Sequence, residues 1–232
     1  MKMGWHDLLF MHYRVSVSQL RSLIPAGLEM DTYDGSAWIG IVPFRMTGVS
    51  PRLVPPLPGI SKFPELNVRT YVTIDGKPGV WFFSLDATSW LAVRSARRFF
   101  HLNYVDANIN FRGNEQSGDG TWFGYESTRT HKDAPPAKLK CEYRPIGAKY
   151  QAAPNTLEHF LTARYCLYSA SPKGKIYRGE IDHLPWELSD AQVLVSENTM
   201  LDGLGIDTRD QQPVLHFAGQ TQAKAWLLTP VT

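Results

Sequence analysis

The feature that most constrains this chain is a hairpin between residues 65 and 85. Residues 65–75 alternate polar and apolar side chains, residues 75–79 (DGKPG) carry a turn signal, and residues 80–85 (VWFFSL) are apolar on both faces. A strand that is apolar on both faces is typical of a position covered on both sides. The second strand of the hairpin is therefore predicted to lie near the middle of a sheet.

The rest of the chain adds many strands and few helices. Capping-box spacing predicts short helices at 16–24 and 155–161, and an amphipathic pattern predicts a third at 89–100. Further strands are predicted at 8–15, 37–44, 103–111, 122–126, 138–144, 165–169, 175–182, 191–196 and 214–228. This pattern indicates an α+β fold, in which short helices flank a large antiparallel, barrel-like sheet. No linker divides the sequence, so residues 1–232 are interpreted as one domain.

Composition narrows the function classes. The chain has 232 residues, 43% of them hydrophobic, and a net charge of +2. It is therefore expected to bury a large core, and its balanced charge gives no field to attract nucleic acid or an anionic membrane. No apolar run approaches the roughly 18–20 residues of a membrane-spanning helix, and no signal-type segment is visible, so a cytoplasmic location is expected.

Four polar side chains share one face of the strand that begins at residue 65. Because strand side chains alternate, Glu65, Asn67, Arg69 and Tyr71 point the same way, about 7 Å apart in successive pairs. A solvated outer face would have the same pattern. The buried strand that follows favours the other interpretation, in which this face lines an internal cavity that holds a polar ligand.

The predicted helix at 89–100 carries an arginine beside its apolar arc. Arg97 lies next to Val93 and Trp90 on the helical wheel, and the arc itself includes Phe99. An arginine so placed needs a carboxylate or carbonyl partner, or it binds an anionic ligand. A structural partner is the commoner case.

Residues 51–64 (PRLVPPLPGISKFP) combine five prolines with apolar side chains. Those side chains favour an ordered loop that folds onto the body over a solvated linker. A lid over a pocket and a simple crossover between parts of the sheet are both consistent with the pattern.

Other chemical signatures are weak. The seven histidines show no metal-ligand spacing, the two cysteines form no framework, and no metal or cofactor is expected. The sequence contains no nucleophile elbow and no phosphate-binding loop.

Several segments resemble a known family. They are residues 8–46 (LLFMHYRV…VPFRM), PELNVRTYV at 64–72, GKPGVWFFSLDA at 76–87 and SARRFFHLNY at 95–104. They resemble the bacterial YqjF-like family of unknown function, which is placed in the acetoacetate decarboxylase-like superfamily. The resemblance covers most of residues 5–112 and implies that superfamily's fold.

The resemblance also implies positions for a site. Glu65 falls on the active-site glutamate of acetoacetate decarboxylase, and Arg97 falls on the arginine of its Gly-Arg-Glu element. Asn103, Tyr104 and Val105 stand where that enzyme has Pro-Lys-Lys, whose first lysine forms a Schiff base. Tyrosine cannot form an imine, so decarboxylation through a Schiff base is not expected at this position.

Together these inferences predict a pocket for a small, anionic oxo or carboxylate metabolite. Glu65 and Tyr104 are the candidate catalytic pair, and Arg69, Arg97, Asn67 and Tyr71 are the candidate binding residues. Two functions stay open: an enzyme of lyase, hydratase or isomerase type, and a binding protein without catalysis. A third, a self-associating structural protein, is favoured only if the polar face of residues 65–71 is solvated. Homo-oligomer formation is left open beside them.

Overall fold

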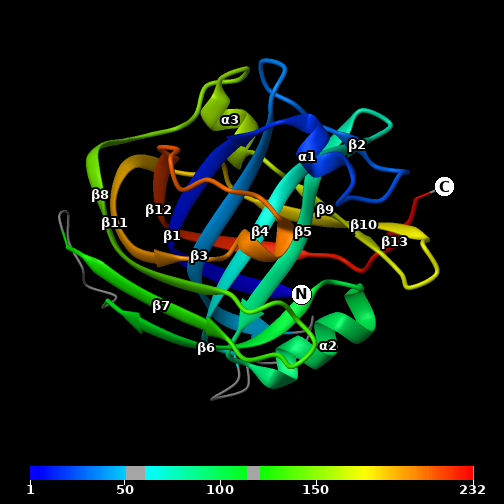
Figure 1. Cartoon of the computed structure of the whole chain (residues 1–232), viewed down its shortest axis with the longest axis horizontal. Helices are drawn as coiled ribbons and strands as arrows, with labels where there is room; N and C mark the ends of the chain where they lie inside the picture. The colour runs from blue at the N-terminus through cyan, green and yellow to red at the C-terminus, as the bar shows by residue number, and fades with distance from the viewer. Residues whose placement is uncertain (51–60, 114–120, 232) are drawn as a thin grey trace.

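The computed structural model describes residues 1–50, 61–113 and 121–231 (Figure 1). The helices are α1 (Val17–Arg21), α2 (Trp90–Phe100) and α3 (Leu157–Thr162), with a 3₁₀ turn at Asp202–Leu204. The strands are β1 (Lys2–Val15), β2 (Glu29–Met30), β3 (Ala37–Ser50), β4 (Phe63–Ile74), β5 (Lys77–Ala87), β6 (Tyr104–Arg112), β7 (Phe123–Arg129), β8 (Lys138–Tyr150), β9 (Cys166–Ala170), β10 (Ile176–His183), β11 (Leu188–Asn198), β12 (Val214–Ala225) and β13 (Thr229–Pro230).

Local signals form the predicted turns and caps. Ser16 caps α1: its side chain accepts a hydrogen bond from the Gln19 backbone, and the Gln19 side chain accepts one from the Ser16 backbone. In the hairpin between β4 and β5, Asp75 and Gly76 have φ values of 52° and 70°. Such a left-handed pair forms a tight hairpin turn and fixes the register of the two strands.

The strand pairings close into two rings that share a wall. The larger ring runs through nine strands, in the order β5, β6, β7, β8, β11, β12, β1, β3 and β4. The smaller ring runs through seven, in the order β5, β9, β10, β12, β1, β3 and β4. Strands β12, β1, β3, β4 and β5 belong to both. All pairings are antiparallel except β5 with β6 and β5 with β9. The predicted barrel-like α+β fold is confirmed.

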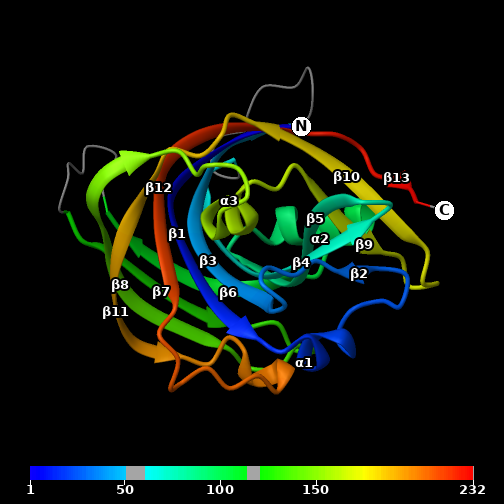
Figure 2. The same ribbon diagram turned by 90° about the horizontal axis from the view of Figure 1, so that it is seen from above.

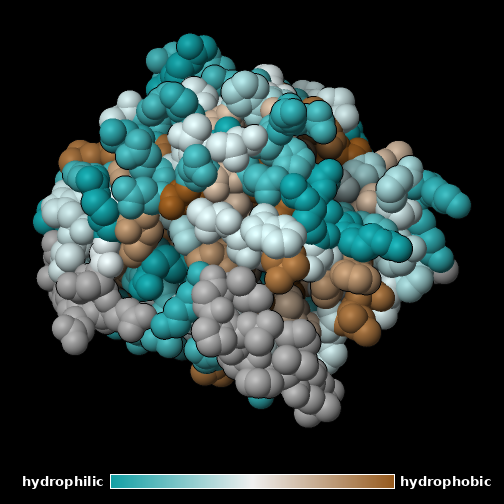
Figure 3. Space-filling view, turned by 90° about the horizontal axis from the view of Figure 1, so that it is seen from below, coloured by the Kyte–Doolittle hydropathy of each residue, from teal (hydrophilic) through white to brown (hydrophobic). Residues whose placement is uncertain are grey.

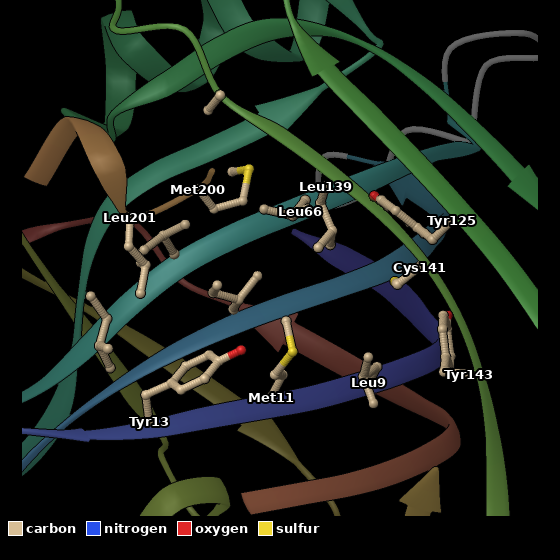
Figure 4. Close-up of a cluster of buried hydrophobic side chains, with 14 of the residues drawn as sticks. Leu9, Met11, Tyr13, Leu66, Tyr125, Leu139, Cys141, Tyr143, Met200 and Leu201 are labelled. Carbon is tan, nitrogen blue, oxygen red and sulfur yellow. The ribbon is translucent and has the colours of Figure 1, made fainter. Parts of the chain in front are cut away.

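Most residues of β1, β3 and β4 are buried, because each side of these shared strands looks into one ring. From β1, Leu9, Met11 and Tyr13 point into the large core of the nine-strand ring (Figure 4). The neighbouring Leu8 and Phe10 belong to the core of the seven-strand ring. The doubly apolar pattern of such strands follows directly from this position.

A β-bulge at Asp7 keeps the apolar side chains of β1 facing the interiors of the two rings on both sides of the irregularity. Trp5 and Leu8 both line the interior of the seven-strand ring. They are three positions apart, and strict alternation along a strand would place them on opposite faces. The register between β1 and β3 shifts by one residue after His6, and Asp7 has a φ of 54°. The extra residue restores the alternation.

Two helices cover the ends of the seven-strand ring. Figure 2 looks along this ring, with α3 in its near opening and α2 at the far end. The α2 helix packs on β5 and β6 through Val93, which is fully buried. None of the described helices has the length and apolar character needed to cross a membrane.

Three expectations differ from the structure or fall outside it. The strands β1, β3 and β8 extend well beyond the predicted residues 8–15, 37–44 and 138–144, because bulges and glycines carry the pairing through irregular sequence. Phe99, assigned to the apolar arc of α2, is 69% exposed. Most of the proline-rich loop, at 51–60, lies outside the described residues.

Candidate functional site

A cavity of about 400 Å³ occupies the interior of the seven-strand ring. All seven strands and α2 contribute to its lining, and most of the lining side chains are apolar. The polar side chains are few, and three of them come from alternate positions of β4: Glu65, Asn67 and Arg69. A mostly apolar cavity with a few convergent polar groups is the usual form of a small-molecule site.

The strand β4 places these side chains because both of its edges are paired. It hydrogen-bonds to β3 on one side and β5 on the other, and its second face packs Leu66 and Val68 into the nine-strand core. The polar face is thereby left to the smaller ring. Glu65 is 1% exposed and Asn67 is 6% exposed, so neither belongs to a solvated outer surface.

Glu65 is paired with the phenol of Tyr104. The Tyr104 hydroxyl donates a hydrogen bond of 2.9 Å to Oε2 of Glu65. Burial raises the pKa of Glu65 to about 8; the hydrogen bond from Tyr104 opposes this rise, and the charge of Asp86 adds to it. Burial, with the nearby Glu65, also raises the pKa of Tyr104 well above 10. At neutral pH both groups therefore hold their protons, and the pair can donate a proton to a ligand.

Arg69 lies in the cavity without a carboxylate. Its Nη2 donates to the backbone oxygen of Leu161 at 3.1 Å, and its guanidinium stands 5.3 Å from the Phe10 ring centre and 5.7 Å from that of Tyr71. Its Nε is buried without a hydrogen-bond partner, and no ion pair of Arg69 occurs among the described residues. One positive charge is therefore available to an anion.

Asn67 stands between Glu65 and Arg69 on β4. Its Oδ1 is also buried and lacks a hydrogen-bond partner. Buried polar atoms are nearly always paired, so an unpaired atom in a cavity wall indicates a place where a ligand or water binds.

A second arginine, Arg164, also lines the cavity and is already compensated. It forms an ion pair with Asp31 and donates from Nε to the Phe160 backbone oxygen at 2.7 Å. Its guanidinium packs over the rings of Tyr71 and Phe160, at 4.7 and 4.3 Å from their centres. Arg164 therefore contributes to the floor of the cavity, and its charge is balanced.

Tyr71 supports the floor from below and is absent from the lining. Its hydroxyl lies 2.7 Å from the Leu161 oxygen, to which it donates, and 2.6 Å from Nε2 of His12. Burial lowers the pKa of His12 well below 6.5, and the charge of Arg69 lowers it further, so this histidine is neutral. Tyr71 and Arg69 thus share one carbonyl, which fixes the position of both.

Arg97 does not reach the cavity. Its Nη1 donates to the backbone oxygen of Tyr104 at 2.8 Å, which ties α2 to the start of β6. Of the six side chains predicted from the sequence, Glu65, Asn67, Arg69 and Tyr104 come together in the lining, whereas Tyr71 lies beneath it and Arg97 lies outside it.

Sequence reasoning missed Arg164, His12 and Asp86. Arg164 follows α3 directly, and no local pattern distinguishes it from a surface arginine. Asp86 lies in β5 as a lone acid after an apolar run; it is fully buried against Arg129, at 2.7 Å. An acidic residue in an otherwise apolar strand is the one sequence signal that could have predicted the buried pair of Asp86 and Arg129.

Among residues 1–50, 61–113 and 121–231, no three His, Cys, Asp or Glu side chains come together as a metal site would require.

The two-ring sheet defines the class of fold, which is that of the acetoacetate decarboxylase-like proteins. The enduracididine biosynthesis enzyme MppR, complexed with the condensation product of pyruvate and imidazole 4-carboxaldehyde, has a TM-score of 0.67 at 12% identity, over 99% of this chain and 88% of that one. An acetoacetate decarboxylase-like enzyme from Sphingomonas wittichii RW1 gives 0.66 at 13% identity, over 99% and 92%. Acetoacetate decarboxylase from Legionella pneumophila gives 0.62 at 10% identity, over 100% and 87%. At these identities the likeness establishes the fold alone.

The sequence narrows the class to one family. The chain belongs to the DUF2071 family, described as an uncharacterized conserved protein, whose model matches residues 2–222. It is 44% identical over 228 residues to the uncharacterized protein YqjF of Bacillus subtilis strain 168, with 98% of this chain and 91% of YqjF covered. The resemblance inferred from residues 5–112 is thereby confirmed.

Proposed function

We propose that the cavity of the seven-strand ring binds an organic carboxylate or oxo acid, and that Glu65 and Tyr104 transfer a proton to or from it. The observation that carries the proposal is the presence, in one apolar cavity, of an arginine without a carboxylate partner and a fully buried carboxyl group. A buried arginine without a partner favours an anion as its ligand. A carboxyl group with a pKa near 8 is suited to proton transfer at neutral pH.

The proposed roles follow from the chemistry of each group. Arg69 holds the carboxylate of the ligand, and Asn67 accepts a hydrogen bond through Oδ1 from a hydroxyl group elsewhere on the ligand. Glu65 donates its proton to the developing oxyanion or carbanion, and the Tyr104 hydroxyl stabilises the carboxylate that remains. This set suits a lyase, hydratase or isomerase. None of the described lining residues is a lysine, so a Schiff base forms no part of the proposal.

The alternative is a binding protein that does no chemistry. It is favoured by the extent of the apolar lining and by the hydrogen bond that already occupies Glu65. Both functions need Arg69, and only the enzyme needs Glu65.

Binding is tested by titration calorimetry with a panel of carboxylates and oxo acids, each paired with its neutral methyl ester. We expect acids to bind and Arg69→Met to weaken binding at least about tenfold, since a hydrogen bond to a charged group contributes about 1.5–3 kcal/mol. Arg112→Met is the matched control, because Arg112 is an exposed arginine of β6 in the other ring. Esters that bind as tightly as acids would contradict the proposal.

Catalysis is tested separately. A bound oxo acid is incubated with the protein in D₂O, and loss of its C–H proton signal is followed by NMR. An enzyme should exchange that proton, and Glu65→Gln should abolish the exchange while acids still bind. Binding without exchange in the unsubstituted protein would favour the binding protein.

A further inference from the structure

Arg69 and Glu65 lie at different depths of the cavity. In the register of the ring, Arg69 pairs with Gly40 and Phe82, whereas Glu65 pairs with Phe44 and Ala87. Four residues of extended strand separate them, which corresponds to about 13 Å between their Cα atoms. The backbone positions of the two groups that the proposed function requires therefore lie at different levels of the cavity wall.

The guanidinium of Arg69 points to the closed end of the cavity. It is bonded to the Leu161 oxygen of α3 and lies beside the Phe10 and Tyr71 rings. Tyr71 is fully buried beneath it, and the compensated Arg164 stands at the same end. This end of the ring is a polar floor that carries one unbalanced positive charge.

Among the described residues, the opposite end of the cavity is lined mainly by apolar side chains, some of them exposed. Past Glu65, the lining consists of side chains such as Met46, Phe63 and Phe100. Three of the exposed lining residues mark the opening: Met1 at 37%, Leu91 at 40% and Trp226 at 47%. Figure 3, which shows the molecule from below, has small apolar patches on a mostly hydrophilic surface.

Between the floor and the opening the wall is mostly apolar, and its polar residues include Asn67 of β4 and His183 and Glu180 of β10. Phe82 and Leu85 from β5 and Val42 from β3 line this middle section, and Asn67 supplies its unpaired oxygen there. The order along the ring is therefore cation, amide, carboxyl group and then an apolar channel.

We infer that the ligand is an elongated, amphipathic monocarboxylic acid with an oxo or hydroxyl group on its chain, several bonds from the carboxylate. This inference rests on the proposed function and specifies its substrate class. The carboxylate binds Arg69 at the floor, the functional group reaches Asn67 and Glu65, and an alkyl or aryl tail fills the channel under α2. A three-carbon acid bound at Arg69 does not reach Glu65.

The test is a calorimetric series of straight-chain saturated acids from acetate to decanoate, with octanol as the neutral comparison. Burial of each methylene contributes about 0.8 kcal/mol, so the affinity is expected to rise about fourfold per added methylene until the tail reaches the opening. Arg69→Met should weaken octanoate at least about tenfold and leave octanol unchanged.

A second set of variants locates the tail. Ala96 and Ser95 of α2 line the channel, so Ala96→Phe or Ser95→Phe should weaken decanoate about tenfold or more and leave butyrate unchanged. Arg98→Phe is the matched control, because Arg98 is an exposed residue of the same helix. Two obstructing variants are made in case one of them fails to fold. A single variant whose Tm shows that it is folded is enough for the test.

The outcomes separate the two proposals. Acids that bind through Arg69 with an affinity independent of chain length, or an obstruction that weakens butyrate and decanoate equally, would overturn the elongated ligand and leave the proposed function standing. Acids that fail to bind, or that bind equally well to Arg69→Met, would overturn both.

Discussion

At the scale of single residues, the cavity stores a proton on Glu65 that the unfolded chain would release. The pKa of this carboxyl group is about 8 in the folded protein, against 4.5 for a free glutamate. Between these values the folded state binds one more proton than the unfolded state. The free energy of unfolding therefore falls as pH rises from about 4.5 to about 8, and levels off above that range.

Glu65→Gln is expected to remove this slope. Each pKa unit corresponds to about 1.4 kcal/mol, so the variant should gain up to about 4 kcal/mol over the unsubstituted protein between pH 5 and 8.5. The difference between the two proteins is the quantity to measure, by urea unfolding, because the buried His12, His183 and His216 have lowered pKa values that give the opposite slope. Parallel curves would mean that Glu65 is ionised in the folded protein.

The two cavity arginines should respond differently to removal. Arg164→Met leaves Asp31 without its partner and is expected to destabilise the fold by about 3–5 kcal/mol. Arg69→Met removes an uncompensated charge and should leave the free energy of unfolding unchanged or raise it. Urea unfolding of both variants checks this contrast, and an equal loss in both would show that Arg69 also has a structural partner.

Residues could be predicted from the sequence only where a local pattern reports their environment. Period-two alternation placed Glu65, Asn67 and Arg69 on one face, and the apolar partner strand favoured an interior for it. The floor could not be found in this way, because Arg164 and His12 reach it from segments that are distant in the sequence. The partner of Arg97 is a backbone carbonyl. A backbone partner cannot be identified from the pattern of side chains in the sequence.

At the scale of elements, the bulge in β1 decides which side chains face each ring. Asp7 takes up the extra residue in a left-handed conformation, which Asp and Asn tolerate far better than β-branched residues do. Its carboxylate also pairs with Arg45. The alternation of side chains predicted a strand from residue 8, where the regular part of β1 begins. It could not predict that strand pairing continues through the bulge to residue 2.

Comparison of Asp7→Asn with Asp7→Val should isolate the backbone contribution. Both variants lose the carboxylate, and only Val is strained at φ 54°. The Val variant is expected to be less stable by about 1–2 kcal/mol, measured as the difference in unfolding free energy in urea. Equal losses would indicate that the strand relaxes its bulge at little cost.

At the scale of the whole molecule, the two rings share five strands. Neither ring closes without β12, β1, β3, β4 and β5. The interpretation of the chain as a single domain therefore predicts one calorimetric transition, with equal calorimetric and van't Hoff enthalpies. Two resolved transitions would show that one ring persists after the other has opened.

In the wall between the rings, the effect of a substitution depends on which face of the strand carries the residue. On β4, odd-numbered residues such as Glu65 and Asn67 face the cavity, and even-numbered ones such as Leu66 and Val68 pack the larger core. Substitutions at odd positions can therefore reshape ligand preference, while even positions continue to specify the architecture. Ligand preference can therefore diverge through substitutions on one face of the strand, while the residues on the other face preserve the fold.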